Sequence, residues 1–269
     1  PVEFSAGKVV LPPLMPRWAD YPVPAYFEER YPSAQTIVDN DVNLMALGEH
    51  RTHYQEVKHL LFVKVGTGIG CGIVTEGDIY RGAQGAAGDI GHIRVAGHDD
   101  VLCECGNVAC LEAIASGRAL ARALRERGLT PEGSRDVVAL VKGQNRQAVH
   151  LVREAGRLIG EVLASLVNAF NPSVIVIGGD LSAAAQQLFA GIREVVYKRS
   201  TALATRHLEI VPTSLDDRAG VIGAAVMAIE HILAPEAIDR HVLRDGVRLK
   251  PVSAVTRRSR APAPGATRR

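Results

Sequence analysis

Three cysteines and a histidine in one short stretch are the residues whose types and spacing point most directly to chemistry. Cys103, Cys105 and Cys110 lie within eight residues, and His92 precedes them by a short loop. Three thiolates and one imidazole make a tetrahedral zinc set with every position filled by protein, which is typical of structural zinc. A disulfide is less favoured because one of the three thiols would stay unpaired and no secretory signal is expected. A cluster of ordinary reduced thiols is the remaining alternative.

The fourth cysteine, Cys71, lies far from the others in an apolar run. A single thiol in such a run is predicted to be a small core residue rather than a reactive one.

A second polar group, Asn40, Asp41 and Asn43, lies where a predicted short β run over residues 36–41 meets a predicted helix over 42–50. Asn and Asp at such a junction are favoured as helix caps. The same side chains, grouped beside a buried strand, would also serve as a binding site. The residues alone leave both interpretations open.

Glycine-rich turns form the third feature. The turn Gly66-Thr67-Gly68-Ile69-Gly70 separates two apolar runs, 60–65 and 71–75, which predicts a β-hairpin. Its amides and the Thr67 hydroxyl can face a phosphate, although most such turns are only tight turns. A second glycine-rich loop, residues 81–92, allows close approach of the backbone to a compact polar ligand. A third glycine segment, Gly178-Gly179, follows an apolar run that is predicted to be a strand. The carboxyl end of such a strand is where ligands bind in open α/β sheets, although the two glycines are equally consistent with a simple turn.

Hydrophobic periodicity supplies the elements that would position these residues. Apolar spacing predicts a brief helix over 25–30 and longer helices over 111–127, 147–170 and 219–232. Strands are predicted over 174–180 and 208–212, the first buried on both faces. This alternation indicates the α/β class.

Composition bounds the function. The chain has 269 residues, 47% of them hydrophobic and 22% charged, as in globular proteins of one or two domains. No apolar run approaches the ~20 residues of a membrane span, so no membrane partner is expected. The net charge of +2 includes five arginines in the last thirteen residues, so the rest is slightly acidic. Residues from 252 onward are predicted to be disordered by composition. Reduced cysteines favour the cytoplasm.

Several of these motifs, taken together and in order, resemble the ROK family of bacterial sugar kinases and sugar-responsive transcriptional repressors. The matching segments are Asn-Asp-x-Asn at 40–43 with Ala46 and Glu49, the glycine hairpin, Gly-Asp-Ile-Gly-His at 88–92, the cysteine motif at 103–112 and Ile-Gly-Gly at 177–179. The chain departs from the family pattern at Asp89, where Glu is usual, and at Ala109, where Gly is usual.

The resemblance implies an α/β fold of the actin-like ATPase (ribonuclease H-like) type, mostly the C-terminal lobe plus part of the N-terminal lobe. Residues 1–57 would be the remainder of the N-terminal lobe. Residues 58–235 would form the C-terminal lobe with the zinc knot and the glycine-rich hairpin, and 236–269 an extension with a disordered tail.

The resemblance also implies roles for single residues. It places a sugar among Asn40, Asp41, Asp89, His92 and Glu112, with Asp41 as general base in the kinases. It implies nucleotide contacts at Gly66, Thr67, Gly68, Gly70, Gly178 and Gly179. His92, Cys103, Cys105 and Cys110 would hold zinc, so that His92 serves both metal and sugar. Asp89 is one methylene shorter than glutamate, which bears on the identity of the sugar.

Two parts of the family pattern are missing from these residues. Neither the first phosphate loop, Asp-x-Gly-Gly-Thr, nor a helix-turn-helix is found, and both would precede residue 1. The expected function is therefore the sugar-binding sensor of a ROK-type repressor, which contacts DNA through that missing helix-turn-helix. The alternative is an ATP- and Mg-dependent hexose kinase, glucokinase-like, and a third option is a degenerate member that only dimerises. A homodimer or higher homo-oligomer is usual for the family.

Overall fold

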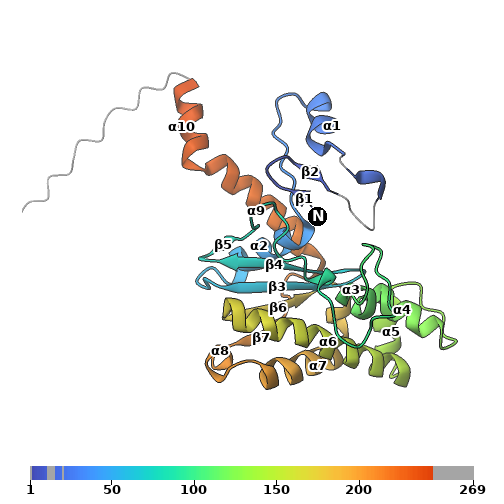
Figure 1. Ribbon diagram of the computed structural model, residues 1–269. Helices are drawn as coiled ribbons and strands as arrows, with labels where there is room; N and C mark the ends of the chain where they lie inside the picture. The colour runs from blue at the N-terminus through green and yellow to red at the C-terminus, as the bar shows by residue number, and fades with distance from the viewer. Residues whose placement is uncertain (1, 11–15, 20, 245–269) are drawn as a thin grey trace, which may run out of the picture. The chain divides into compact units, whose positions relative to one another are not determined.

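A mixed five-stranded sheet organises the computed structural model, which describes residues 2–10, 16–19 and 21–244. The strands are β3 (Leu60–Val65), β4 (Ile69–Thr75), β5 (Asp78–Ile79), β6 (Val174–Gly178) and β7 (Glu209–Pro212). Their order is β5-β4-β3-β6-β7, with β3, β6 and β7 parallel and the β3–β4 and β4–β5 pairs antiparallel (Figure 1). The predicted hairpin and both predicted later strands are confirmed.

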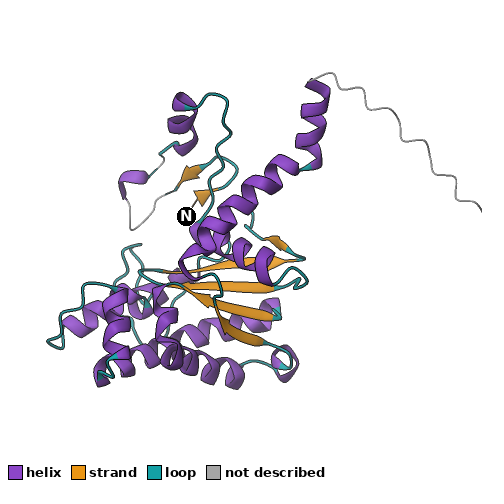
Figure 2. Ribbon diagram, turned by 180° about the vertical axis from the view of Figure 1, so that it is seen from behind, coloured by secondary structure: helices purple, strands orange, loops and turns teal. Residues whose placement is uncertain are grey.

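Helices cover both faces of the sheet because its central strands are apolar on both sides (Figure 2). Leu60 and Phe62 of β3 face α2 (Asp41–His53). Leu61 and Val63 belong to the core cluster that contains residues of α6 (Arg146–Phe170) and α7 (Ala185–Arg199).

Tight packing joins α6 and α7. A Cβ built on Gly156 would lie 2.4 Å from the carbonyl oxygen of Leu188, and one on Gly191 would lie 2.4 Å from that of Arg153. The two backbones therefore approach as closely as glycine allows. The Asn145 side chain caps the start of α6 by accepting from the N–H groups of Gln147 and Ala148.

The predicted helix over 111–127 is wrong in one respect, since it forms two helices, α3 (Leu111–Ala115) and α4 (Gly117–Arg125). Ser116 between them is extended, and its hydroxyl accepts from the N–H of Ala119 at 3.2 Å. The break turns the Gly117 N–H toward the carbonyl oxygen of Gly66 at 2.7 Å. Contact with the hairpin turn thus outweighs helical periodicity at this point.

The predicted β run over 36–41 is also wrong. Residues 33–40 belong to no strand, because no neighbouring strand pairs with them. Side-chain contacts hold the segment instead, as described for Asp39 below.

The remaining elements are mostly short. They are β1 (Val2–Glu3), β2 (Lys8–Val9), η1 (Pro16–Trp18), α1 (Val23–Arg30), η2 (Ile90–His92), α5 (Ser134–Lys142), η3 (Asp180–Ala184), α8 (Ala202–Thr205), η4 (Asp216–Arg218), α9 (Ala219–Leu233) and α10 (Pro235–Arg244). The helices predicted near 25–30, 42–50, 147–170 and 219–232 are confirmed as α1, α2, α6 and α9, whereas α5, α7 and α10 were not predicted.

The chain divides into two compact units, residues 1–229 and 230–269. The predicted lobe boundary between 57 and 58 stays a prediction, and the predicted disorder from 252 lies outside the described residues. Among the described residues, no helix is long and apolar enough to cross a bilayer.

The crossing of α2 and the first part of α9 depends on two glycines. A Cβ on Gly48 would lie 2.3 Å from the carbonyl oxygen of Ala219, and one on Gly223 would lie 1.7 Å from that of Leu44. Since α2 begins at the polar group Asn40–Asn43, this crossing supports the candidate site.

We predict that Gly223→Ala destabilises the folded chain by more than about 2 kcal/mol, because the new methyl must push α9 away from α2. Denaturant unfolding monitored by circular dichroism measures the change. Gly220→Ala is the matched control, since its Cβ would meet nothing closer than 3.7 Å, and alanine is the better helix former by ~0.8 kcal/mol. Equal stability of the two variants would contradict a close helix crossing.

Candidate functional site

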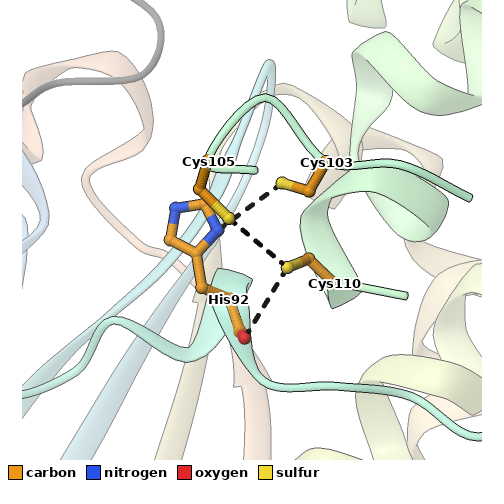
Figure 3. A group of neighbouring side chains, drawn as sticks. All are labelled: His92, Cys103, Cys105 and Cys110. Atoms are coloured by element: carbon orange, nitrogen blue, oxygen red, sulfur yellow. Dashed lines mark hydrogen bonds between the residues drawn. The ribbon is translucent and has the colours of Figure 1, made fainter. Parts of the chain in front are cut away.

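The four predicted metal ligands gather into one cluster (Figure 3). The ligand atoms of His92, Cys103, Cys105 and Cys110 all lie within 4.8 Å of one another. The Sγ atoms of Cys105 and Cys110 are 3.7 Å apart, and Nδ1 of His92 is 3.6 Å from Sγ of Cys103. A tetrahedral ion with metal–sulfur bonds of about 2.3 Å separates its sulfurs by about 3.8 Å. The donor set therefore fits a metal ion, and all four cysteines are free thiols rather than disulfides.

Short backbone pairings hold the cluster in shape. Arg94 bridges to Cys110 and Leu102 to Val108, and the Cys103 N–H donates to the carbonyl oxygen of Asn107 at 2.8 Å. Ala109 has φ +59°, a left-handed conformation that costs a non-glycine residue about 1–2 kcal/mol. This explains physically why glycine suits the position in the family pattern.

Glu112 connects the cluster to the glycine hairpin. It follows Cys110 in the first turn of α3 and is 9% exposed. Its Oε2 accepts from the N–H of Ile69 at 2.9 Å, and a Cβ on Gly68 would lie 2.4 Å from the same oxygen. The hydrogen bond holds the carboxylate of Glu112 against the turn. Residue 68 must be glycine, because any Cβ there would overlap the carboxylate oxygen.

Asp89 precedes η2 and His92 ends it. Nε2 of His92 is 3.9 Å from Oδ1 of Asp89, while Nδ1 faces Cys103. The ring is therefore oriented with one nitrogen toward the thiols and the other beside a carboxylate. The predicted dual role of His92 in metal and sugar binding stays a prediction.

The group at the start of α2 is not a helix cap. Asn40 occupies the N-cap position but makes no capping hydrogen bond. Its Nδ2 donates to the carbonyl oxygen of Gly85 at 3.4 Å. The capping interpretation is therefore wrong, because the three side chains have other partners: Asn40 contacts the loop at Gly85, Asp41 pairs with Lys64 of β3, and Asn43 donates to Asp39.

Asp41 is paired with a lysine that sequence reasoning missed. Nζ of Lys64 donates to Oδ2 of Asp41, and the lysine side chain is 32% exposed. Lys64 lies in β3 opposite Gly70 of β4 and Gly178 of β6. The signal that could have found it is a lone charged residue in an otherwise apolar strand.

The glycines predicted to bind nucleotide have structural explanations of their own. A Cβ on Gly178 would lie 2.5 Å from the Phe62 ring, and Gly179 has φ +82°. Gly66 accepts at its carbonyl oxygen from Gly117, and Thr67 is exposed in the turn. Their predicted nucleotide contacts stay predictions.

A cavity of about 400 Å³ lies beside Gly179, at the carboxyl ends of β6 and β7. Asp180, Asp216, Asp217 and Arg135 are its charged lining residues. Arg135 pairs with Asp180 at 3.3 Å and with Asp217 at 3.9 Å. The guanidinium of Arg135 therefore pairs with two of the three carboxylates that line the cavity.

Cys71 is a core residue, as predicted. It is fully buried in β4, and burial raises the pKa of its thiol to about 12. At neutral pH it is a neutral thiol, which is unreactive as a nucleophile.

We predict that the purified chain carries one metal ion, measured by inductively coupled plasma mass spectrometry. Cys105→Ser should lose most of it, because the ligand set falls to three, and the melting temperature should fall. Cys71→Ala is the control and should keep the full metal content. A metal-free chain with unchanged melting temperature would contradict a structural metal.

Comparisons with known proteins agree with this geometry. The family model described as "ROK family" matches residues 1–231. A putative xylose repressor of Caldicellulosiruptor sp. strain Rt8B.4 is 38% identical over 247 residues, covering 87% of this chain and 61% of the repressor. A glucokinase of Halalkalibacterium halodurans is 34% identical over 222 residues, covering 77% of this chain and 67% of that enzyme. The chain thus spans about three fifths of the length of the xylose repressor it matches.

Solved structures similar to this chain also include both a transcriptional regulator and a kinase. A ROK family transcriptional regulator, described as a homologue of the Escherichia coli MLC protein, superposes with a TM-score of 0.78 at 26% identity, covering 90% of this chain and 63% of that one. The ROK hexokinase of Thermus thermophilus superposes with a TM-score of 0.71 at 32% identity, covering 86% of this chain and 76% of the enzyme. The predicted actin-like ATPase fold is confirmed by these neighbours. The family match and the superpositions together show that the chain belongs to the ROK family.

Proposed function

We propose that the chain is the sugar-binding sensor part of a ROK-type transcriptional regulator. Its candidate pocket is formed by Asn40, Asp41, Asp89, His92 and Glu112 around one end of the β3–β4 hairpin. Carboxylates, an amide and an imidazole are the groups that bind neighbouring hydroxyls of a sugar ring. Since the relatives are named xylose repressors and glucokinases, the expected ligand is a neutral pentose or hexose.

The Lys64–Asp41 ion pair orients the carboxylate that both candidate functions would use. Nζ of Lys64 donates to Oδ2 of Asp41, which leaves Oδ1 to accept a hydrogen bond from a sugar hydroxyl. A general base in a kinase would use the same oxygen. The observation that favours a sensor over a kinase is the charge of the cavity beside Gly179.

The cavity beside Gly179 also fits a nucleotide poorly. Kinases surround phosphates with positive groups and metal ions, whereas three of the four charged lining residues here are carboxylates. ATP and Mg²⁺ therefore belong to the alternative function, a glucokinase-like phosphotransferase with Asp41 as base, which the glucokinase relatives favour.

Zinc is the metal we propose for the cysteine cluster. Three thiolates and one imidazole suit Zn²⁺ in a closed tetrahedral site. Its role would be structural, since it would hold His92 and, through Cys110, the helix that carries Glu112.

The proposed assembly follows the regulator relatives. DNA would be contacted by a helix-turn-helix outside these residues, and the protein would act in the cytoplasm as a homodimer or higher homo-oligomer. In this proposal residues 1–57 belong to the N-terminal lobe and residues 58–235 form the C-terminal lobe.

We predict that the chain binds D-xylose or D-glucose in titration calorimetry without phosphorylating either sugar. Sugar-dependent ADP formation from Mg-ATP, followed in a coupled assay, is the measurement that separates the two functions. Turnover that disappears in Asp41→Asn would establish the kinase instead. Absence of binding by any pentose or hexose tested would contradict the sugar site.

Glu112→Gln should lower sugar affinity about tenfold or more, because a hydrogen bond to a charged carboxylate is replaced by a weaker one. The amide oxygen can still accept from the Ile69 N–H, so the hairpin and the metal content should be preserved. Calorimetry gives the affinity and metal analysis gives the control. Unchanged affinity would remove Glu112 from the pocket.

A further inference from the structure

The carboxylate of Asp39 is the most completely bonded polar group near the candidate pocket, although it belongs to none of the predicted site residues. Its side chain is 2% exposed. Oδ1 accepts from the Asn40 N–H at 2.7 Å and from Nδ2 of Asn43 at 2.8 Å. Oδ2 accepts from Nε and Nη2 of Arg81 at 2.8 and 2.7 Å. All four acceptor positions of the carboxylate are used.

Arg81 belongs to the other half of the pocket. It lies in the loop between β5 and η2, which leads to Asp89 and His92. Its carbonyl oxygen accepts from the Ala87 N–H at 3.1 Å, so the residue is part of the loop's own fold. The guanidinium lies over the Phe4 ring, 4.0 Å from its centroid, which restricts its orientation further.

The loop is fixed along its length as well. Gly88 has φ +91°, and a Cβ there would lie 1.8 Å from the carbonyl oxygen of Cys71. The carbonyl oxygen of Gly88 accepts from the Cys71 N–H at 2.9 Å. The Tyr80 N–H also donates to the carbonyl oxygen of Ile73 in β4 at 2.8 Å. With Gly85 bound by Asn40 at 3.4 Å and Arg81 bound by Asp39, the loop is attached both to β4 and to the segment that leads into α2.

We propose that Asp39 and Arg81 are positioning residues of the sugar site: their buried pair sets the spacing between the Asn40–Asp41 corner and the Asp89–His92 half. This rests on the proposed function, because it assigns the pair's effect to sugar binding. Two guanidinium N–H groups that converge on one carboxylate oxygen, as those of Arg81 do on Oδ2 of Asp39, restrict direction as well as distance. A sugar that must contact both halves at once would then bind a pocket that is already formed, and it would not have to order two loops.

The experiment compares Asp39→Asn, Arg81→Met and the double variant by calorimetry with D-xylose and D-glucose. Each single variant should weaken binding about tenfold or more, as expected when a preorganised site loses a charged hydrogen-bonded pair. The double variant should be no weaker than the singles, because the two residues act as one unit. Arg81→Lys, which keeps the charge but loses the two-pronged geometry, should fall between the unmodified chain and Arg81→Met. Arg199→Met is the control, since it removes the exposed pair with Glu161, and it should bind as the unmodified chain does.

A deoxy analogue of the bound sugar separates positioning from simple destabilisation. If glucose is the ligand, the unmodified chain should bind D-glucose more tightly than 2-deoxy-D-glucose. The ratio of these two affinities should be smaller in Arg81→Met. Partial unfolding would weaken both sugars by the same factor and leave the preference unchanged, which would overturn the proposal. Equal sugar affinity of all variants would also overturn it. If the unmodified chain binds neither sugar, the proposed function itself fails, and that outcome is distinct from the others.

Discussion

The arrangement of four soft donor atoms around one point is the constraint on which the candidate site depends. His92 and Cys110 belong to that set, and Glu112 is two residues from Cys110. Fixing the donors therefore fixes an imidazole and a carboxylate together. Because Glu112 also accepts a hydrogen bond from the Ile69 N–H beside the β3–β4 turn, the position of this His/Cys cluster is linked to that of the glycine hairpin.

The sheet makes this possible by being buried on both faces. Alternate residues of β3 pack against α2 on one side and belong to the larger core cluster on the other, so a shift by one residue would exchange the two sets between cores of different shape. The hairpin turn consequently has a fixed position, to which Gly117 and Glu112 both bond. The break at Ser116 follows from the same requirement, since an unbroken helix would not direct the Gly117 N–H toward Gly66.

Side-chain contacts connect the start of α2 to two neighbouring segments. Arg81 of the loop before η2 pairs with Asp39, and Lys64 of β3 pairs with Asp41. Three carboxylates and one arginine line the cavity beside Gly179.

The sequence by itself determined the α/β class, the strands of the hairpin, the long helix α6 and the metal set, since these depend on local periodicity and on residue types that have few other uses. It could not reveal Asp39, Arg81 or Lys64 as partners, because the pairs Asp39–Arg81 and Asp41–Lys64 lie 42 and 23 residues apart. The break at Ser116 and the different partner of Asn40 have the same cause, since a contact with a distant segment is stronger than the local preference. Residues 36–41 form no strand because no neighbouring strand pairs with them. In each case only the tertiary structure decides which segments meet.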